Sequence, residues 1–161
     1  MPDFEPPPDP SARDALDLAV RHHGENRLAE AERLYRRILR DAPAHPTALH
    51  LLGVVLHQRG NGGDSVDLIT KALALKPDYA AAHGNLGNAQ RGLGKLDDAL
   101  ESYRAALALA PDSADLLTNY GLVLHAMGTL GDAVANHDKA LALAPGHAEA
   151  HSNRGAALQD L

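Results

Sequence analysis

Apolar and small side chains recur at fixed places along the chain, and the whole pattern repeats at a constant interval. Pro43, Pro77, Pro111 and Pro145 are each 34 residues apart, and a run rich in Ala and Leu precedes each of the last three. A fixed period of about 20 to 50 residues indicates a protein built by stacking copies of one supersecondary unit. The pattern therefore predicts an array of repeated units.

Within each unit the pattern predicts a helix, a tight turn and a second helix. Asn26, Gly60, Gly94 and Gly128 mark the turns, because Gly and Asn accept the left-handed backbone that ends a helix. Helices of this length are marginal alone in water, so each must bury an apolar face on its neighbours. The predicted first helices are residues 11–24, 46–59, 80–93, 114–127 and 148–160. The predicted second helices are residues 28–41, 64–76, 96–110 and 130–144.

The turn of the second unit, GNGGDS, departs from the other turns. Gly62 stands where Leu28, Leu96 and Leu130 stand in the other units, so we expect this turn to be the loosest. The stretch lacks the Gly-Lys-Ser/Thr ending and the preceding strand of a phosphate-binding loop. A plain turn is therefore favoured over a nucleotide site.

Small residues occupy two positions of every unit, counted from residues 12, 46, 80, 114 and 148. These small residues would let the paired helices approach closely. Position 24, in contrast, carries large side chains: Tyr35, Ile69, Tyr103 and, in the fourth unit, His137. Position 8 holds Ala19, Gly53, Gly87, Gly121 and Gly155, and position 20 holds Ala31, Ser65, Ala99 and Ala133.

Composition narrows the class of function. The formal net charge of −6 over 161 residues provides no general attraction to nucleic acid or to an anionic membrane. There is no cysteine, and no stretch approaches the length of a membrane-spanning helix. We expect a cytoplasmic protein with neither a nucleic-acid nor a membrane partner.

The first ten residues differ from the rest because they contain five prolines and three acids. We expect residues 1–10 to be a disordered leader, with Ser11 as the N-cap of the first helix. A ligand for a proline-binding domain is the alternative for the leader.

The period and the small positions resemble those of the tetratricopeptide repeat family. The resemblance implies an all-α, right-handed α-solenoid over residues 11–161, with four full repeats and one extra helix. The sequence departs from the family pattern at position 4, where other residues, for example His83 and His151, replace the usual aromatic. The expected repeats are residues 12–45, 46–79, 80–113 and 114–147, with a partial repeat at 148–161.

The resemblance places the first helices on the concave face, where equivalent residues of successive units become neighbours. Asn85, Asn119 and Asn153 share position 6, and their amides could hold the main chain of an extended peptide. They resemble the asparagines in the superhelical arm of O-GlcNAc transferases, which binds the backbone of substrate proteins. Asp17 and Leu51 interrupt the series in the first two units, and capping or gap filling is the alternative role.

Position 12 carries a second series near the end of each first helix: His23, His57, Arg91, His125 and Gln159. Such side chains oppose the negative end of the helix dipole, which is the simplest reason for the series. The alternative is a groove edge that becomes more positive at low pH. The complete set of predicted groove residues is Asn85, Asn88, Asn119, Asn153, His57, Arg91 and His125.

No catalytic motif and no cofactor site stand out, and histidines of successive units are too far apart to share a metal ion. We expect a non-catalytic module that binds an extended or helical peptide segment of a protein partner. The alternative is the substrate-recruiting arm of a longer, O-GlcNAc transferase-like enzyme, and a third hypothesis is self-association through the C-terminal partial repeat. We expect the chain to be part of a longer array, because Ala156, Ala157 and Leu158 would leave an apolar face partly open.

Two other hypotheses carry less weight. The basic run Arg33, Arg36, Arg37 and Arg40 is interpreted as the solvated face of a second helix. The carboxylate clamp of chaperone-binding repeat proteins is disfavoured, because Leu16 and Val20 occupy the positions that would need Lys and Asn.

Overall fold

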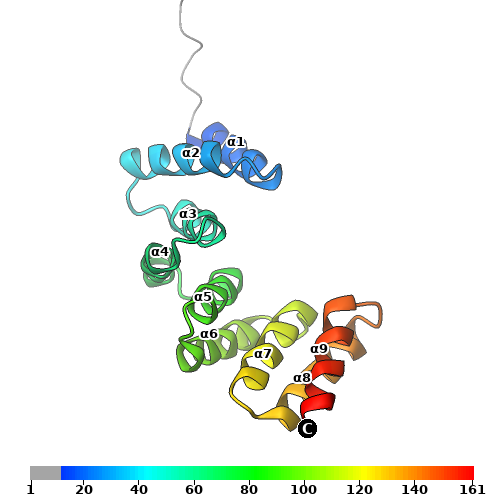
Figure 1. Ribbon diagram of the computed structural model, residues 1–161. Coiled ribbons are helices and arrows are strands. Elements are labelled where there is room, and N and C mark those ends of the chain that lie inside the picture. Colours follow the sequence, from blue (N-terminus) through cyan, green and yellow to red (C-terminus); the bar gives the residue numbers. More distant parts are fainter. Residues whose placement is uncertain (1–11) are drawn as a thin grey trace, which may run out of the picture.

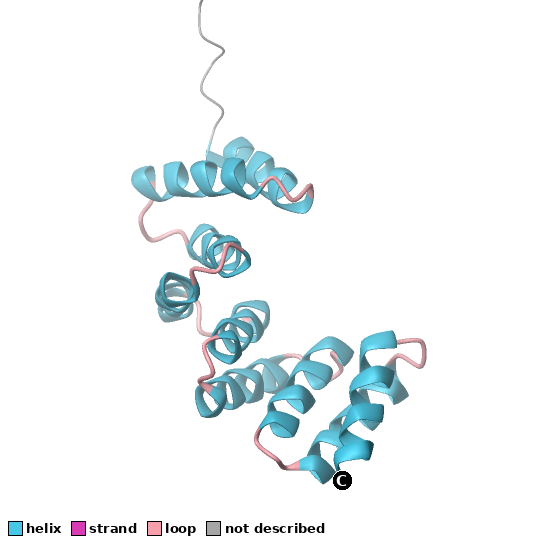
Figure 2. Cartoon of the chain, in the orientation of Figure 1, coloured by secondary structure: helices cyan, strands magenta, loops and turns pink. Residues whose placement is uncertain are grey.

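The structure, a computed structural model, describes residues 12–161, and this part of the chain contains nine α-helices and no strand (Figure 2). The predicted all-α solenoid is confirmed, and the predicted helices begin and end within two residues of the observed ones. The leader and the Ser11 cap lie outside the described residues. The first helices are α1 (Ala12–Gly24), α3 (Pro46–Gln58), α5 (Ala80–Gly92), α7 (Ala114–Ala126) and α9 (Ala148–Asp160). The second helices are α2 (Leu28–Asp41), α4 (Gly62–Leu75), α6 (Leu96–Leu109) and α8 (Leu130–Leu143).

The turn inside each unit ends the first helix with one residue of positive φ. Asn26 has φ 58°, and Gly60, Gly94 and Gly128 have φ 85°, 74° and 79°. In each turn the next amide bonds back five residues, a Schellman-type closure that satisfies a carbonyl at the end of the helix. The predicted turn residues are confirmed.

The second turn has the same geometry as the others, so the expectation of a looser turn is not borne out. Its two closing hydrogen bonds, from Gly60 N to His57 O and from Asn61 N to Leu56 O, measure 2.9 and 2.8 Å. Helix α4 therefore begins at Gly62, two residues before the predicted start. A Cβ on Gly62 would lie 2.8 Å from Leu93 Cδ2, so packing against the next unit compensates for the low helix propensity of glycine.

The small residue at position 8 lies against the large side chain at position 24 of the same unit. A Cβ added to Gly53 would lie 2.5 Å from Ile69 Cγ1, and one added to Gly121 would lie 2.7 Å from His137 Cε1. Ala31, Ala99 and Ala133, at position 20, have no exposed surface. The predicted close approach of paired helices is confirmed, and its contacts form the core of each unit.

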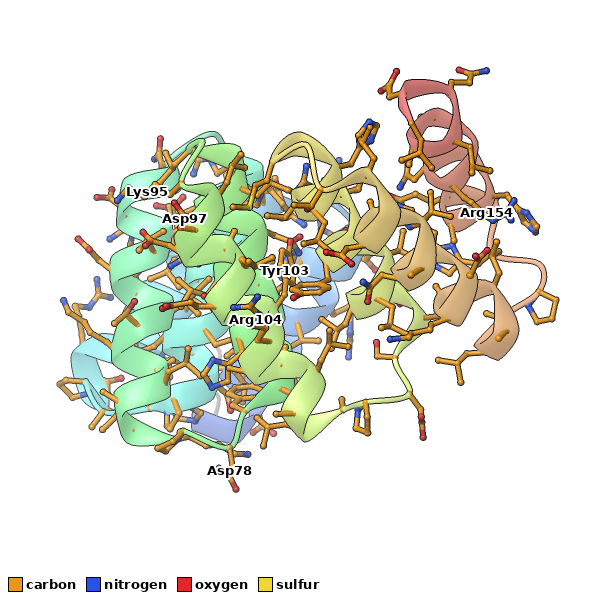
Figure 3. All side chains as sticks on the ribbon, turned by 90° about the horizontal axis from the view of Figure 1, so that it is seen from below. Asp78, Lys95, Asp97, Tyr103, Arg104 and Arg154 are labelled. Carbon is orange, nitrogen blue, oxygen red and sulfur yellow. The ribbon has the colours of Figure 1, made fainter. Side chains whose placement is uncertain are left out.

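The units stack into a curved array (Figure 1). Neighbouring first helices contact each other directly, α3 with α5, α5 with α7 and α7 with α9, whereas successive second helices of the described chain show no comparable contact. The first helices therefore lie on the inner side of the curve, and Figure 1 shows α4 and α6 on the outer side. Figure 3 shows Lys95, in a turn within a unit, and Asp78, in a connection between units, at opposite ends of the helices.

The face of α9 that would meet a second helix is open among the described residues. A Cβ on Gly155, at position 8, would have no neighbour within 4 Å, and Leu158 is 44% exposed. Ala156 is exposed as expected, but Ala157 is fully buried. The expectation for Ala157 was wrong because this residue points toward α7 and α8, where it joins the cluster that contains Val123 and Ala133.

Candidate functional site

A hollow of about 440 Å³ lies between the two first helices α5 and α7, on the inner side of the array. Helix α5 contributes Asn85 and Asn88, and α7 contributes Asn119. Small residues form much of the remaining wall, including Ala80, Ala81 and Gly84, so a ligand backbone could come close to the helices. Three of the predicted groove residues thus line one hollow.

Asn85 is held in place by a residue of the preceding unit. Its amide nitrogen lies 2.8 Å from Nε2 of His50, in α3. Because an amide nitrogen can only donate, Nε2 accepts, and the ring proton sits on Nδ1 and is donated to the Tyr79 hydroxyl at 2.9 Å. The ring of Tyr79 also packs edge-on against that of His50, with centroids 4.7 Å apart.

Burial keeps His50 neutral. The residue is 3% exposed, and desolvation, followed by the charge of His23, lowers its pKa from 6.5 to about 4. At neutral pH the ring therefore presents an accepting nitrogen to Asn85 permanently. The result is a fixed amide orientation at the wall of the hollow.

The hydrogen-bonded chain continues from Asn85 along α5 and into α6. Asn88 Nδ2 donates to Asn85 Oδ1 at 3.5 Å, and the Tyr103 hydroxyl donates to Asn88 Oδ1 at 2.6 Å. Tyr103, labelled in Figure 3, is fully buried. Desolvation raises its pKa, and Arg91 partly opposes the shift. Asn85 still has one N–H and one lone pair unused, so it is positioned without being saturated.

Asn119 and Asn153 differ from Asn85. Asn119 is half-buried in the wall of the hollow, and its amide has no hydrogen-bond partner among the described residues. Asn153, on α9, is also half-buried, and its Nδ2 is inaccessible and unpaired within the described part of the chain. It does not line this hollow. Asn119 is therefore the amide most available to a ligand here.

The residues at position 12 tie one unit to the next. His23 Nε2 donates to Gln58 Oε1 at 3.0 Å, and His125 Nε2 donates to Asp160 Oδ2 at 2.7 Å, each across 35 residues. The ring of His57 lies against Gly92 at the equivalent place, 3.1 Å from where a Cβ would be. Each position-12 histidine thus contacts the residue at position 13 of the following unit. The histidines therefore link successive units, which their interaction with the helix dipole alone does not explain.

Four further histidines support the connections between units. His45 and His147 cap α3 and α9 by accepting, on Nδ1, the amide protons of Ala48 and Ala150 at 3.2 Å. At position 4, His83 and His151 each donate from Nε2 to the carbonyl of a proline six residues earlier, at 2.8 Å. This bond gives the histidines that replace the usual aromatic a structural role. No group of three or more His, Cys, Asp or Glu side chains in the described part of the chain could hold a metal ion.

Sequence reasoning missed His50 and Tyr79. The signal for His50 was weak but present, since it is the only ionisable residue at position 5 of any unit. Its hydrogen bond to Asn85, 35 residues away, depends on how far one stacked helix is shifted along the next. The repeat period alone does not predict this shift.

Comparison with known proteins agrees with the repeat architecture. Two sequence models of the tetratricopeptide repeat match residues 16–80 and 80–113, which together span more than half of the chain. The chain belongs to the tetratricopeptide repeat family. A search of curated proteins found no matching sequence.

Solved structures show the same fold. A crystal structure of MamA is 25% identical, with a TM-score of 0.80 over 89% of this chain and 84% of that one. The hetero-tetramer Cut9-Hcn1 of APC/C gives 24% identity and a TM-score of 0.88 over 91% of this chain and 30% of that one. YrrB, described as a TPR protein with an unusual peptide-binding site, gives 21% identity and a TM-score of 0.79 over 90% and 75%.

None of the helices in the described residues is both long enough and apolar enough to span a membrane.

Proposed function

We propose that this chain is a non-catalytic protein-interaction module that holds an extended segment of a partner protein in the hollow between α5 and α7. The observation that carries the proposal is the gathering of Asn85, Asn88 and Asn119 around one hollow of about 440 Å³. Each amide offers both a donor and an acceptor, which is what a peptide backbone requires. The peptide-binding site named for YrrB, a structure with the same fold, adds support by analogy.

Asn85 and Asn119 would contribute to binding in different ways. Asn85 is oriented by His50 and Asn88, so little side-chain entropy is lost when it binds a ligand. The NH₂ and the C=O of the Asn119 side chain are both available, so Asn119 would form more new hydrogen bonds with the ligand than Asn85. Recognition of backbone rather than side chains would make the site tolerant of partner sequence.

Asn119→Ala tests the proposal with the least damage to the fold, because it breaks no observed hydrogen bond. Peptides are first selected on the wild-type chain from a random library, and their affinities are then measured by titration. We expect Asn119→Ala to weaken binding about tenfold, the equivalent of one or two lost hydrogen bonds. Asn61→Ala is the matched control, since Asn61 is exposed in a turn and makes no side-chain cap bond.

The peptide supplies a second arm of the test. Methylation of single backbone amides in a selected peptide should abolish binding at one or two sites, whereas alanine substitution of its side chains should have small effects. Unchanged affinity of Asn119→Ala, together with insensitivity to backbone methylation, would exclude the proposed site.

A further inference from the structure

A second hollow, of about 480 Å³, lies on the outer side of the array between α2 and α4. Its floor is apolar, because Leu39, Leu49, Leu52 and Leu68 line it. Leu49 and Leu52 belong to α3 and are almost fully buried, so the floor is a fixed part of the core. The hollow is built by two units and does not depend on the groove of the inner side.

The rim of this hollow is cationic. It carries Arg36, Arg40 and Lys71, all exposed, and none of the described residues that line it is acidic. Arg36 uses its Nε in a bond of 2.9 Å to Glu32, but Arg40 and Lys71 have no ion-pair partner among the residues that the structure describes. Three cations around one apolar floor stand out in a chain whose net charge is −6.

The next such hollow, between α6 and α8, provides an internal comparison. It also measures about 480 Å³, and its lining includes Leu107, Pro111, Leu117 and Lys139. These residues hold the same repeat positions as Leu39, Pro43, Leu49 and Lys71 of the first hollow. Their shared geometry comes from the repeat, so differences between the hollows come from the residues around them.

The charges of the two hollows differ. In α6 the position of Arg40 is taken by Ala108, and the position of Arg36 is taken by Arg104, whose Nε bonds to the Tyr120 hydroxyl at 3.0 Å. The hollow between α6 and α8 is lined by one cation, Lys139, and one acid, Asp112. The cationic rim is therefore a feature of the first two units and not of the fold.

We propose that the hollow between α2 and α4 binds an acidic amphipathic segment of a partner protein, with Leu or Phe on the floor and Asp or Glu on the rim. Arginine guanidinium groups pair well with carboxylates, and the apolar floor takes the side chains between them. A free phosphate would use the rim but gain nothing from the floor. The segment, with both kinds of side chain, uses the whole hollow.

A smaller adjoining hollow determines which way round the segment binds. It measures about 290 Å³ and shares Arg36, Leu68 and Lys71 with the first, but Asp64 and Asp67 also line it. These aspartates repel carboxylates at that end. The acidic residues of the segment therefore lie toward Arg40, and a neutral or basic residue follows them toward Asp64.

The test is a selection from a random peptide library on the full chain, followed by affinity measurement with the enriched peptides. We expect a class of peptides in which Asp or Glu flanks Leu or Phe. The double variant Arg40→Glu/Lys71→Glu should weaken their binding about tenfold or more, and the loss should shrink at high salt. Lys139→Glu is the matched control, because Lys139 holds the repeat position of Lys71 in the other hollow, and it should leave the affinity unchanged.

Four outcomes would overturn the proposal. The first is a selection that enriches no acidic class. The second is an acidic class that binds the double variant as well as it binds the wild type, while circular dichroism shows both chains folded. Displacement of the peptides by millimolar inorganic phosphate would reduce the hollow to an anion site. Concentration-dependent self-association that the double variant abolishes would assign the hollow to a second copy of the chain.

Discussion

The glycine at position 8 decides how closely the two helices of a unit approach. In the second unit a Cβ on Gly53 would lie 2.5 Å from Ile69 Cγ1 and 3.1 Å from the backbone oxygen of Ser65. The backbone contact leaves little room for relaxation, since the helices themselves would have to move apart.

Gly53→Ala should therefore destabilise the chain by about 1 to 3 kcal/mol through overpacking. Urea-induced unfolding followed by circular dichroism measures the change. Gly155→Ala is the matched control at the same position, because a Cβ there meets nothing within 4 Å. This control should be neutral or stabilising by about 0.5 to 1 kcal/mol, as expected for Gly→Ala in a helix. Equal losses in the two variants would refute the packing argument.

His50 links stability to pH. Its pKa is lowered to about 4 in the folded chain, so protonation favours the unfolded state, in which the ordinary value of 6.5 applies. This group leaves stability unchanged above pH 6.5, lowers it as the pH falls from 6.5 to 4, and lowers it no further below 4. The shift corresponds to a loss of about 3 kcal/mol at the acid end of this window.

We expect His50→Gln to be less stable than the wild type at pH 7 but to lose less stability between pH 6.5 and pH 4. Thermal or urea unfolding at a series of pH values measures the difference in slope. His151→Gln is the control, because His151 is exposed and, within the described part of the chain, its ring bonds only to the Pro145 carbonyl. Parallel pH profiles for wild type and His50→Gln would show that His50 is not the responsible group.

At the scale of the element, α9 is held differently from every other first helix. Two histidine–aspartate pairs fasten it to α7, one from His125 to Asp160 at 2.7 Å and one from His147 to Asp115 at 2.9 Å. Its other face has no second helix against it in the described structure, as the open space at Gly155 shows. In a stacked array each unit is stabilised only by its neighbours, so α9 should open locally.

Amide hydrogen exchange should be faster in α9 than in α5, which is covered on both sides. Asp115→Asn with Asp160→Asn should increase the exchange rate of α9 about two- to thirtyfold further, because two exposed pairs at about 0.2 to 1 kcal/mol each are lost. The rates in α1 to α4 should not change. An increase spread evenly over the chain would contradict this nearest-neighbour picture.

The elements were predictable because their signals are local. Gly94 and Gly128 mark turns by their backbone freedom, and the prolines mark the connections, so each helix could be located to within two residues. The start of α4 was missed because packing of Leu93 on Gly62 overrides the poor propensity of glycine. Contacts between units were not predictable, since the bond from His50 to Asn85 depends on the stagger of stacked helices.

At the scale of the whole molecule, the repeat produces two kinds of surface from one unit. On the inner side, neighbouring first helices bring Asn85, Asn88 and Asn119 around one hollow. On the outer side, hollows at equivalent places between second helices have similar volumes but different charge. The fold thus supplies the positions, and substitutions within single units give each position its chemistry.

The central claim is that the amides on the inner side meet the backbone of a bound segment. Side-chain amide resonances, followed by NMR while a peptide is added that binds the Arg40→Glu/Lys71→Glu variant as well as the wild type, test it most directly. We predict that the NH₂ signals of Asn88 and Asn119 shift with the peptide while that of Asn61 stays in place. Binding of that peptide with the Asn88 and Asn119 signals unmoved would contradict the account.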